Sequence, residues 1–187
     1  SSAASDVYKR QKLNNMRNNF FTKTKNEFYY LIDLIQPSSV FDFFNLIEIN
    51  FFQGWDDNKN LNDLLQENQD IDLKRKSTTQ GPHKSDIKFL INNIDARQIL
   101  SRGEQKFFSI LWSLAQHEVL KKQYKINATL IVDDIKSELD DRVFNLFVET
   151  LKHIKTQAIF SCIDDCFSSK IIASLNEFKK FHVEQLG

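Results

Sequence analysis

ATLIVDDIKSELDDRVFNLFVETLKHIKTQAIFSC, residues 128–162, contains two short apolar runs with an amphipathic segment between them. The first run, residues 128–132, is unbroken, which is typical of a parallel strand that is covered on both faces. Residues 143–154 repeat apolar side chains at helical spacing, and residues 158–162 are again mostly apolar. Strand, helix and strand at these distances predict a right-handed βαβ unit and therefore an α/β fold with parallel strands and flanking helices.

Two carboxylates follow the first apolar run. Ligands of open α/β sheets bind at the carboxyl ends of the strands, so Asp133, Asp134 and the segment after Cys162 are expected to share one edge of the sheet. At this edge Asp133 can hold Mg²⁺ through water, and Asp134 can orient or deprotonate a water that attacks a γ-phosphate. The alternative is that the aspartate pair forms only a turn and a helix cap.

LSRGEQKFFSILWSLAQ, residues 100–116, lies upstream and predicts an amphipathic helix that begins after a polar turn at Gly103. The first amides of such a helix lack intrahelical acceptors and lie at the positive end of the helix dipole, so they can receive a phosphate. Ser101 can equally be the cap of a core helix. SELD, residues 137–140, can likewise be a capping segment at the start of the next helix.

The three motifs occur together and in a specific order. LSRGEQ resembles the signature motif of ABC-type ATPases, TLIVDD resembles their Walker B strand, and SELD resembles their D-loop. GPHKSD, FFQGWDD and the terminal FHVEQLG narrow the resemblance, over residues 40–187, to the carboxyl-terminal part of the RecF family. The resemblance implies part of an ABC-type, P-loop NTPase-like ATPase head, preceded by the remnant of a helical lobe.

The resemblance also implies roles for the signature residues. In this family two heads form an ATP-dependent homodimer, and each ATP lies between the Walker A loop of one subunit and the signature motif of the other. Ser101 and the amides near Gly103 would approach the γ-phosphate held by the partner, and Arg102 would add positive charge. Glu104 and Gln105 would begin the signature helix.

The Walker B and D-loop residues would act differently. Asp133 would bind Mg²⁺ and Asp134 would be the catalytic base, both toward the nucleotide of their own subunit. Ser137 and Asp140 would belong to the D-loop, with Asp140 in contact with the partner. Most ABC-type ATPases have Glu where Asp134 stands, and the shorter side chain of the RecF family is compatible with slow hydrolysis. His83 is either a polar contact near the nucleotide or a residue that stabilises a turn.

Three segments are expected along the chain. Residues 1–11 lack an apolar pattern and resemble a translated adapter remnant, so we expect them to be non-native. Residues 12–70 would hold the remnant of the helical lobe and a connecting strand, with a helix or helix pair up to about residue 36. Residues 71–187 would be the carboxyl-terminal part of the ATPase head. No GxxxxGK[ST] loop occurs, so the resemblance predicts a fragment that has no ATPase activity alone.

Shorter patterns complete the first half of the chain. Residues 43–52 predict a strand that ends at a turn near Gly54, and residues 60–69 predict a short helix. Residues 74–80 are the best linker candidate. The two cysteines, Cys162 and Cys166, fit neither a zinc site nor a disulfide framework and are expected to be reduced packing residues.

The charge balance is even overall but not locally. The 187 residues carry 25 Lys and Arg against 25 Asp and Glu, which argues against one continuous nucleic-acid surface. Residues 72–106 carry 8 basic and 4 acidic side chains, for which a solvated face is the simplest explanation. No apolar run approaches the length of a membrane span, so a cytoplasmic protein without membrane contact is expected.

The resemblance implies an ATP-dependent DNA-binding protein of recombinational repair, replication restart and the SOS response. Its DNA would be gapped, with a junction of single-stranded and double-stranded DNA, and it would act with RecR and RecO to load RecA. The alternatives are another ABC-type head of the SMC-like group and a non-catalytic module for dimerisation or interaction.

Overall fold

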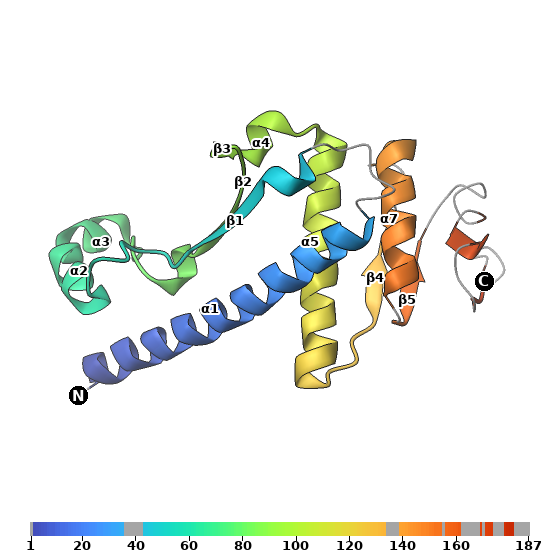
Figure 1. The fold of residues 1–187 in the computed structure, drawn as a ribbon. Coiled ribbons are helices and arrows are strands. Elements are labelled where there is room, and N and C mark those ends of the chain that lie inside the picture. The colour runs from blue at the N-terminus through green and yellow to red at the C-terminus, as the bar shows by residue number, and fades with distance from the viewer. Residues whose placement is uncertain are drawn as a thin grey trace. The chain divides into compact units, whose positions relative to one another are not determined.

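The computed structural model describes residues 2–35, 43–133, 139–154, 156–161, 169, 171–173 and 178–181 (Figure 1). These residues belong to two compact units. The first unit comprises Ser1–Glu27 and Phe43–Ile99, and the second comprises Phe28–Asp42 and Leu100–Gly187. Among the described helices, none combines the length and the apolar character needed to cross a membrane.

Helix α1 (Ser2–Ile35) contributes residues to both units. The predicted helix that ends before Pro37 is confirmed, but it begins at Ser2 and not near residue 12. The early turns carry no apolar stripe, yet they are rich in residues with good helix propensity, such as Ala, Lys, Arg and Gln. A helix can therefore extend through a segment that apolar periodicity does not reveal.

The first unit is built on an antiparallel sheet in the order β1-β2-β3. Its strands are β1 (Ile47–Phe52), β2 (Asp86–Ile91) and β3 (Ile94–Asp95). The predicted strand is confirmed from Ile47 onward, whereas Phe44–Leu46 form a 3-10 turn, η2. Helix α1 packs on β1, since Phe21 stacks on Phe51 at 5.3 Å and Lys25 Nζ donates to the Ile49 carbonyl at 2.8 Å.

A small helical lobe lies between β1 and β2. It contains α2 (Leu61–Glu67), α3 (Gln69–Arg75) and the 3-10 turn η3 (Pro82–Lys84). Its core consists of Trp55, Leu61, Leu64 and Leu65. The predicted short helix is thus present as α2 and continues almost directly into α3, which takes in the first residues of the predicted linker.

Two glycines close the base of this lobe. The Gly81 amide donates to the Gly54 carbonyl at 3.1 Å, and Gly54 has a φ of 105°. A Cβ on Gly54 would lie 2.1 Å from the Gly81 carbonyl oxygen. The turn predicted near Gly54 is therefore confirmed, and both the backbone angle and the close approach require glycine.

The second unit contains the predicted strand-helix-strand segment. Its elements are α5 (Arg102–Tyr124), β4 (Leu130–Val132), α7 (Asp141–His153) and β5 (Ala158–Phe160). The strands β4 and β5 pair in parallel, with Ile131 opposite Ile159, and α7 connects them. The apolar residues predicted to cover the sheet are all buried: Val143, Phe144, Phe147, Val148, Leu151 and Ile154.

One prediction about this sheet is wrong for the described residues. Ile131 is 73% exposed and Ile159 is 56% exposed, so one face of the strand pair is open. On the other face, the Phe160 ring meets Phe147 of α7 at 6.3 Å. An unbroken apolar run thus identified the strand, but the described residues cover only one of its two faces.

Aromatic rings join the end of α1 to α5 within the second unit. Phe28 is fully buried, and its ring lies 6.0 Å from Phe108 and 5.8 Å from Trp112. Each such pair contributes about 0.5–1.5 kcal/mol beyond the buried area. These contacts fix α5, and therefore the signature turn at its amino end, on a packed core.

Candidate nucleotide site

The amino end of α5 is closed by a complete capping box. Ser101 Oγ accepts from the Glu104 amide at 3.3 Å, and Glu104 Oε2 accepts from the Ser101 amide at 2.8 Å. The capping alternative for Ser101 is therefore confirmed. The capping box does not use the amides of Arg102 and Gly103. Both lie in the first turn of α5, before the first amide that donates to a carbonyl of the helix, and neither has an acceptor among the described residues. These amides are the donors available to an anion.

The remaining signature side chains support this turn. Gln105 Nε2 donates to the Leu100 carbonyl at 2.9 Å, which holds the chain that enters the helix. Arg102 is exposed, and Gly103 is half-buried. Gly103 is not among the glycines with positive φ, so its backbone does not need glycine. A need for glycine at this position would come from a group that approaches the backbone of the turn closely.

The amino end of α7 lies beside this turn. Asp140 is the N-cap of α7, and its Oδ1 accepts from the Val143 amide at 2.8 Å. Arg142, two residues later, donates from Nη2 to Glu104 Oε1 at 3.1 Å. The structure therefore brings the predicted signature turn next to the first turn of α7, which Asp140 of the predicted D-loop caps. The sequence did not identify Arg142, because a single arginine in the first turn of a helix matches no motif.

The carboxyl edge of the parallel strands holds a second polar pair. Asp133 follows β4 and Ser161 follows β5, and the Ser161 hydroxyl donates to Asp133 Oδ1. The Ser161 amide also donates to the Val132 carbonyl at 3.1 Å. Asp133 therefore lies at the carboxyl edge of the strand pair, whereas Asp134 and the segment after Cys162, which were expected at the same edge, lie outside the described residues. Ser161 was missed as a site residue, although its place directly after a parallel strand is a usable signal.

Several predicted residues lie outside the described part of the chain. They are Asp134, Ser137, Cys162 and Cys166. Within the described part no cluster of three His, Cys, Asp or Glu side chains could hold a metal ion. The exposed Asp133 carboxylate and the adjacent Ser161 hydroxyl are nevertheless oxygen ligands of the type that Mg²⁺ uses when phosphates and water complete its shell.

His83 stabilises a turn in the first unit. It lies in η3, and its Nε2 is 2.8 Å from the Thr78 carbonyl oxygen. This contact supports the structural alternative stated for His83, because the imidazole bridges the chain on either side of Gly81. A contact with nucleotide remains a prediction.

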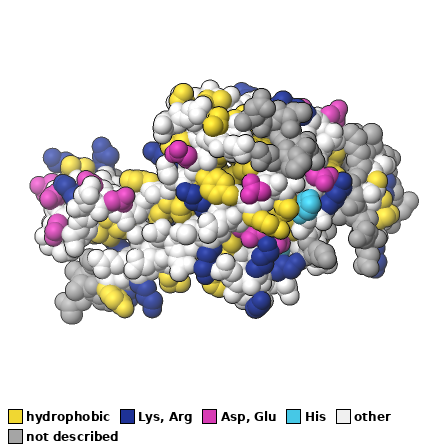
Figure 2. Space-filling model, viewed as in Figure 1, with side chains coloured by type: hydrophobic (Ala, Val, Ile, Leu, Met, Phe, Trp, Pro, Cys, Tyr) yellow, Lys and Arg dark blue, Asp and Glu magenta, His cyan; other side chains and the backbone are white. Residues whose placement is uncertain are grey.

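The basic residues of the central segment are all solvent-exposed. They are Lys74, Arg75, Lys76, Lys84, Lys88, Arg97, Arg102 and Lys106. Arg97 is paired locally, with Nη2 2.6 Å from Asp95 Oδ2, and this hydrogen bond lowers the pKa of Asp95 to about 2. Figure 2 shows Lys and Arg side chains in several places among Asp and Glu side chains. A solvated face accounts for these basic residues.

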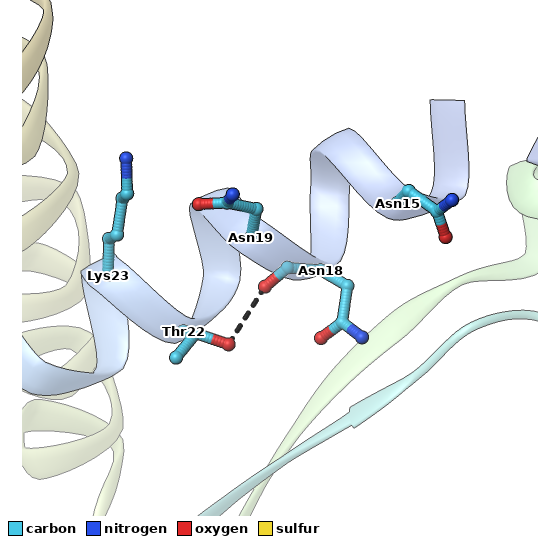
Figure 3. Close-up of a pocket in the computed structure, with 5 residues that line it drawn as sticks. All are labelled: Asn15, Asn18, Asn19, Thr22 and Lys23. Carbon is cyan, nitrogen blue, oxygen red and sulfur yellow. Dashed lines mark hydrogen bonds between the residues drawn. The ribbon is translucent and has the colours of Figure 1, made fainter. Parts of the chain in front are cut away.

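A shallow hollow on α1 has no features of a catalytic site. It measures about 440 Å³ and is lined by Asn15, Asn18, Asn19, Thr22 and Lys23 (Figure 3). The Thr22 hydroxyl donates to the Asn18 carbonyl of the same helix at 3.0 Å. The lining therefore offers carboxamides and one amine, without a carboxylate or a histidine to act as a base.

Known proteins resemble this chain over most of its length. The DNA replication and repair protein RecF of Shewanella frigidimarina (strain NCIMB 400) is 34% identical over 141 residues, which are 74% of this chain and 38% of that protein. RecF of Francisella tularensis subsp. novicida (strain U112) is 32% identical over 145 residues, which are 78% of this chain and 40% of that protein. The chain thus spans about two fifths of the length of these relatives. No family model matches it.

Two solved structures of RecF also resemble this chain. The recombination mediator protein RecF bound to ATP, in the RecFOR pathway, matches with a TM-score of 0.62 and 25% identity over 85% of this chain and 43% of that one. The RecF-ATPrS structure matches with a TM-score of 0.60 and 26% identity over the same shares. The predicted α/β fold of an ABC-type ATPase is therefore confirmed, and the chain belongs to the RecF family of DNA replication and repair proteins.

Proposed function

We propose that this chain closes an ATP site in trans, as the signature-bearing and D-loop-bearing part of a RecF-type, ATP-dependent DNA-binding protein. The observation that supports this most directly is the contact between the amino ends of α5 and α7. Glu104 and Arg142 meet at 3.1 Å, so the signature turn and the D-loop cap Asp140 can face one partner surface together. A capped core helix alone does not need a second helix end at this position.

The proposal assigns the γ-phosphate of the partner's ATP to the α5 end. The amides of Arg102 and Gly103 would donate to it, with the positive end of the helix dipole behind them and the Arg102 guanidinium nearby. Because these donors are backbone groups fixed by the capping box, they need little rearrangement when the phosphate arrives. Ser101, which already accepts from Glu104, can rotate its hydroxyl proton toward a phosphate oxygen.

The strand edge would act on the nucleotide of the same subunit. Asp133, oriented by Ser161, would hold Mg²⁺, which supplies positive charge to the phosphates when it is bound. Asp134, the next residue, would position or deprotonate the attacking water. ATP hydrolysis would be slow and would serve to open the dimer. These roles require a Walker A loop. We expect this loop in the part of a RecF-type protein that the chain does not match.

DNA would be the partner of the assembled protein. The matched relatives are DNA replication and repair proteins, and the RecF of the solved ATP complex acts in the RecFOR pathway. We propose that the closed dimer binds gapped DNA at junctions of single-stranded and double-stranded DNA in the cytoplasm, and acts with RecR and RecO to load RecA. Phosphate contacts rather than base reading would give most of the affinity, so binding should weaken with salt.

A non-catalytic interaction module is the second candidate. The open strand face with Ile131 and Ile159 favours it, because exposed apolar side chains on a sheet are a usual place of association. This candidate predicts association that does not depend on nucleotide. An SMC-like ABC ATPase outside the RecF family is disfavoured by the RecF relatives.

One association experiment separates these candidates. The chain is mixed with full-length Shewanella frigidimarina RecF, in the presence and absence of a slowly hydrolysed ATP analogue, and complexes are measured by sedimentation velocity. Trans closure predicts a heterodimer only with the analogue. A complex of equal strength without nucleotide would support the interaction module. The absence of any complex would contradict the proposed function.

A further inference from the structure

We infer that Arg142 is a positioning residue that couples the signature turn to the D-loop through Glu104. The inference rests on the proposed function, since it concerns how the two segments meet the partner subunit together. Arg142 itself would touch neither ATP nor Mg²⁺. It would act through the carboxylate of Glu104, which closes the capping box of α5.

The two oxygens of the Glu104 carboxylate accept hydrogen bonds from two different donors. Oε2 accepts from the Ser101 amide at 2.8 Å, and Oε1 accepts from Arg142 Nη2 at 3.1 Å. The Glu104 side chain is only 12% exposed, whereas that of Arg142 is 48% exposed. The carboxylate is therefore held in a partly desolvated place, where a charge-assisted hydrogen bond is stronger than at an open surface.

The two charges of the pair differ in how they fit their own helices. Glu104 lies in the first turn of α5, where the helix dipole favours a carboxylate and where the capping box needs a side-chain acceptor. Arg142 lies in the first turn of α7, where the positive end of the helix dipole is unfavourable for a cation. The ion pair with Glu104 offsets this unfavourable position, which favours a role of Arg142 in the contact between the helices and not in the cap of α7.

The contact forms a continuous path between the two predicted trans segments. The path runs from Ser101 through Glu104 and Arg142 to the first turn of α7, which Asp140 caps through the Val143 amide at 2.8 Å. A shift of the signature turn toward a phosphate would pull on Arg142 and therefore on the D-loop cap. We expect the two segments to engage the partner as one unit.

The test uses four variants in the heterodimer assay with nucleotide-loaded Shewanella frigidimarina RecF. Arg142→Met and Glu104→Gln should each weaken association about three- to tenfold, which is the range of a partly exposed charge-assisted contact. The double variant should be no weaker than either single variant, because both remove the same interaction. Arg142→Lys keeps the charge and should restore part of the affinity.

Lys152→Met is the matched control. It removes a cation from the same helix, but Lys152 Nζ pairs with Glu149 Oε2 at 2.6 Å, within α7 itself. Its affinity and that of the wild-type chain should agree. Thermal unfolding of each free variant is measured as well. Arg142→Met should lower the midpoint by only a few degrees, so the variant stays folded at the temperature of the assay and its weaker association is not a loss of folding.

Amide hydrogen exchange gives a readout that needs no nucleotide. Arg142→Met should raise exchange at residues 101–104 severalfold, because Glu104 loses one of its two anchors, whereas Lys152→Met should not. Unchanged exchange together with unchanged affinity of Arg142→Met, or additive effects in the double variant, would overturn the coupling and leave the proposed function intact. Failure of the wild-type chain to associate would overturn the proposed function and the coupling with it.

Discussion

Replacing Phe147 by alanine tests the finding that α7 covers one face of the parallel strands. Phe147 is fully buried, and its ring meets Phe144 at 6.4 Å and Phe160 at 6.3 Å. Truncation of a buried phenylalanine costs about 3–5 kcal/mol of the free energy of unfolding, from lost transfer energy and the cavity that remains. A domain of this kind has roughly 5–15 kcal/mol in total, so the loss is a large fraction of its stability.

Urea denaturation followed by circular dichroism measures this loss. With a slope of about 2 kcal/mol per molar urea, the midpoint of Phe147→Ala should fall by roughly 2 M. Ile131→Ser is the matched control on the opposite face of the same strands, where the side chain is 73% exposed. Its free energy of unfolding should change by about 0.5 kcal/mol or less. Equal losses from the two substitutions would refute the one-sided packing.

Three further predictions concern the lobe and the site. Gly54→Ala should destabilise the chain by more than about 1 kcal/mol in thermal unfolding, because φ is 105° and the Cβ would lie 2.1 Å from the Gly81 carbonyl oxygen; a neutral effect would contradict this packing. Asp140→Ala should cost about 1 kcal/mol by loss of the α7 cap, and Asp140→Ser should recover most of it in the same assay. In a chimera that carries a Walker A loop, Asp134→Asn should preserve ATP binding and slow phosphate release strongly, and unchanged turnover would exclude Asp134 as the base.

The fold of the second unit was predictable because its signals are local. The apolar spacing of α7 depends only on its own sequence, and the side chains that this spacing predicted to face the sheet are buried. The parallel pairing of β4 with β5 follows from the geometry of a strand-helix-strand connection. Coverage of Ile131 was not predictable in this way, because it depends on what packs against the sheet and not on the apolar run itself.

The first unit was less predictable for two physical reasons. The early turns of α1 form without an apolar stripe, so helix propensity and not periodicity determines where the helix begins. The two glycines below the lobe meet only in three dimensions, since the hydrogen bond between Gly54 and Gly81 joins residues far apart in sequence. The sequence indicates a turn there but not its partner.

The site residues that belong to a sequence motif were predictable. Ser101, Glu104 and Asp140 stand where their motifs predict helix ends, and each one is a cap or part of a capping box. Arg142 and Ser161 were missed because their importance comes from a neighbour on another element. A residue of this kind acquires a role only when the fold brings Glu104 or Asp133 to it.

Photo-labelling tests the central claim most directly. Full-length Shewanella frigidimarina RecF is loaded with an ATP analogue that carries a photoreactive group on its γ-phosphate, mixed with the chain and irradiated, and the labelled peptides are identified by mass spectrometry. Trans closure predicts a label within residues 100–105 of this chain, and Ser101→Arg should abolish it by blocking the approach of the turn. A label confined to the full-length partner in a formed complex, or one on this chain that survives Ser101→Arg, would contradict the claim that the signature helix receives the partner's γ-phosphate.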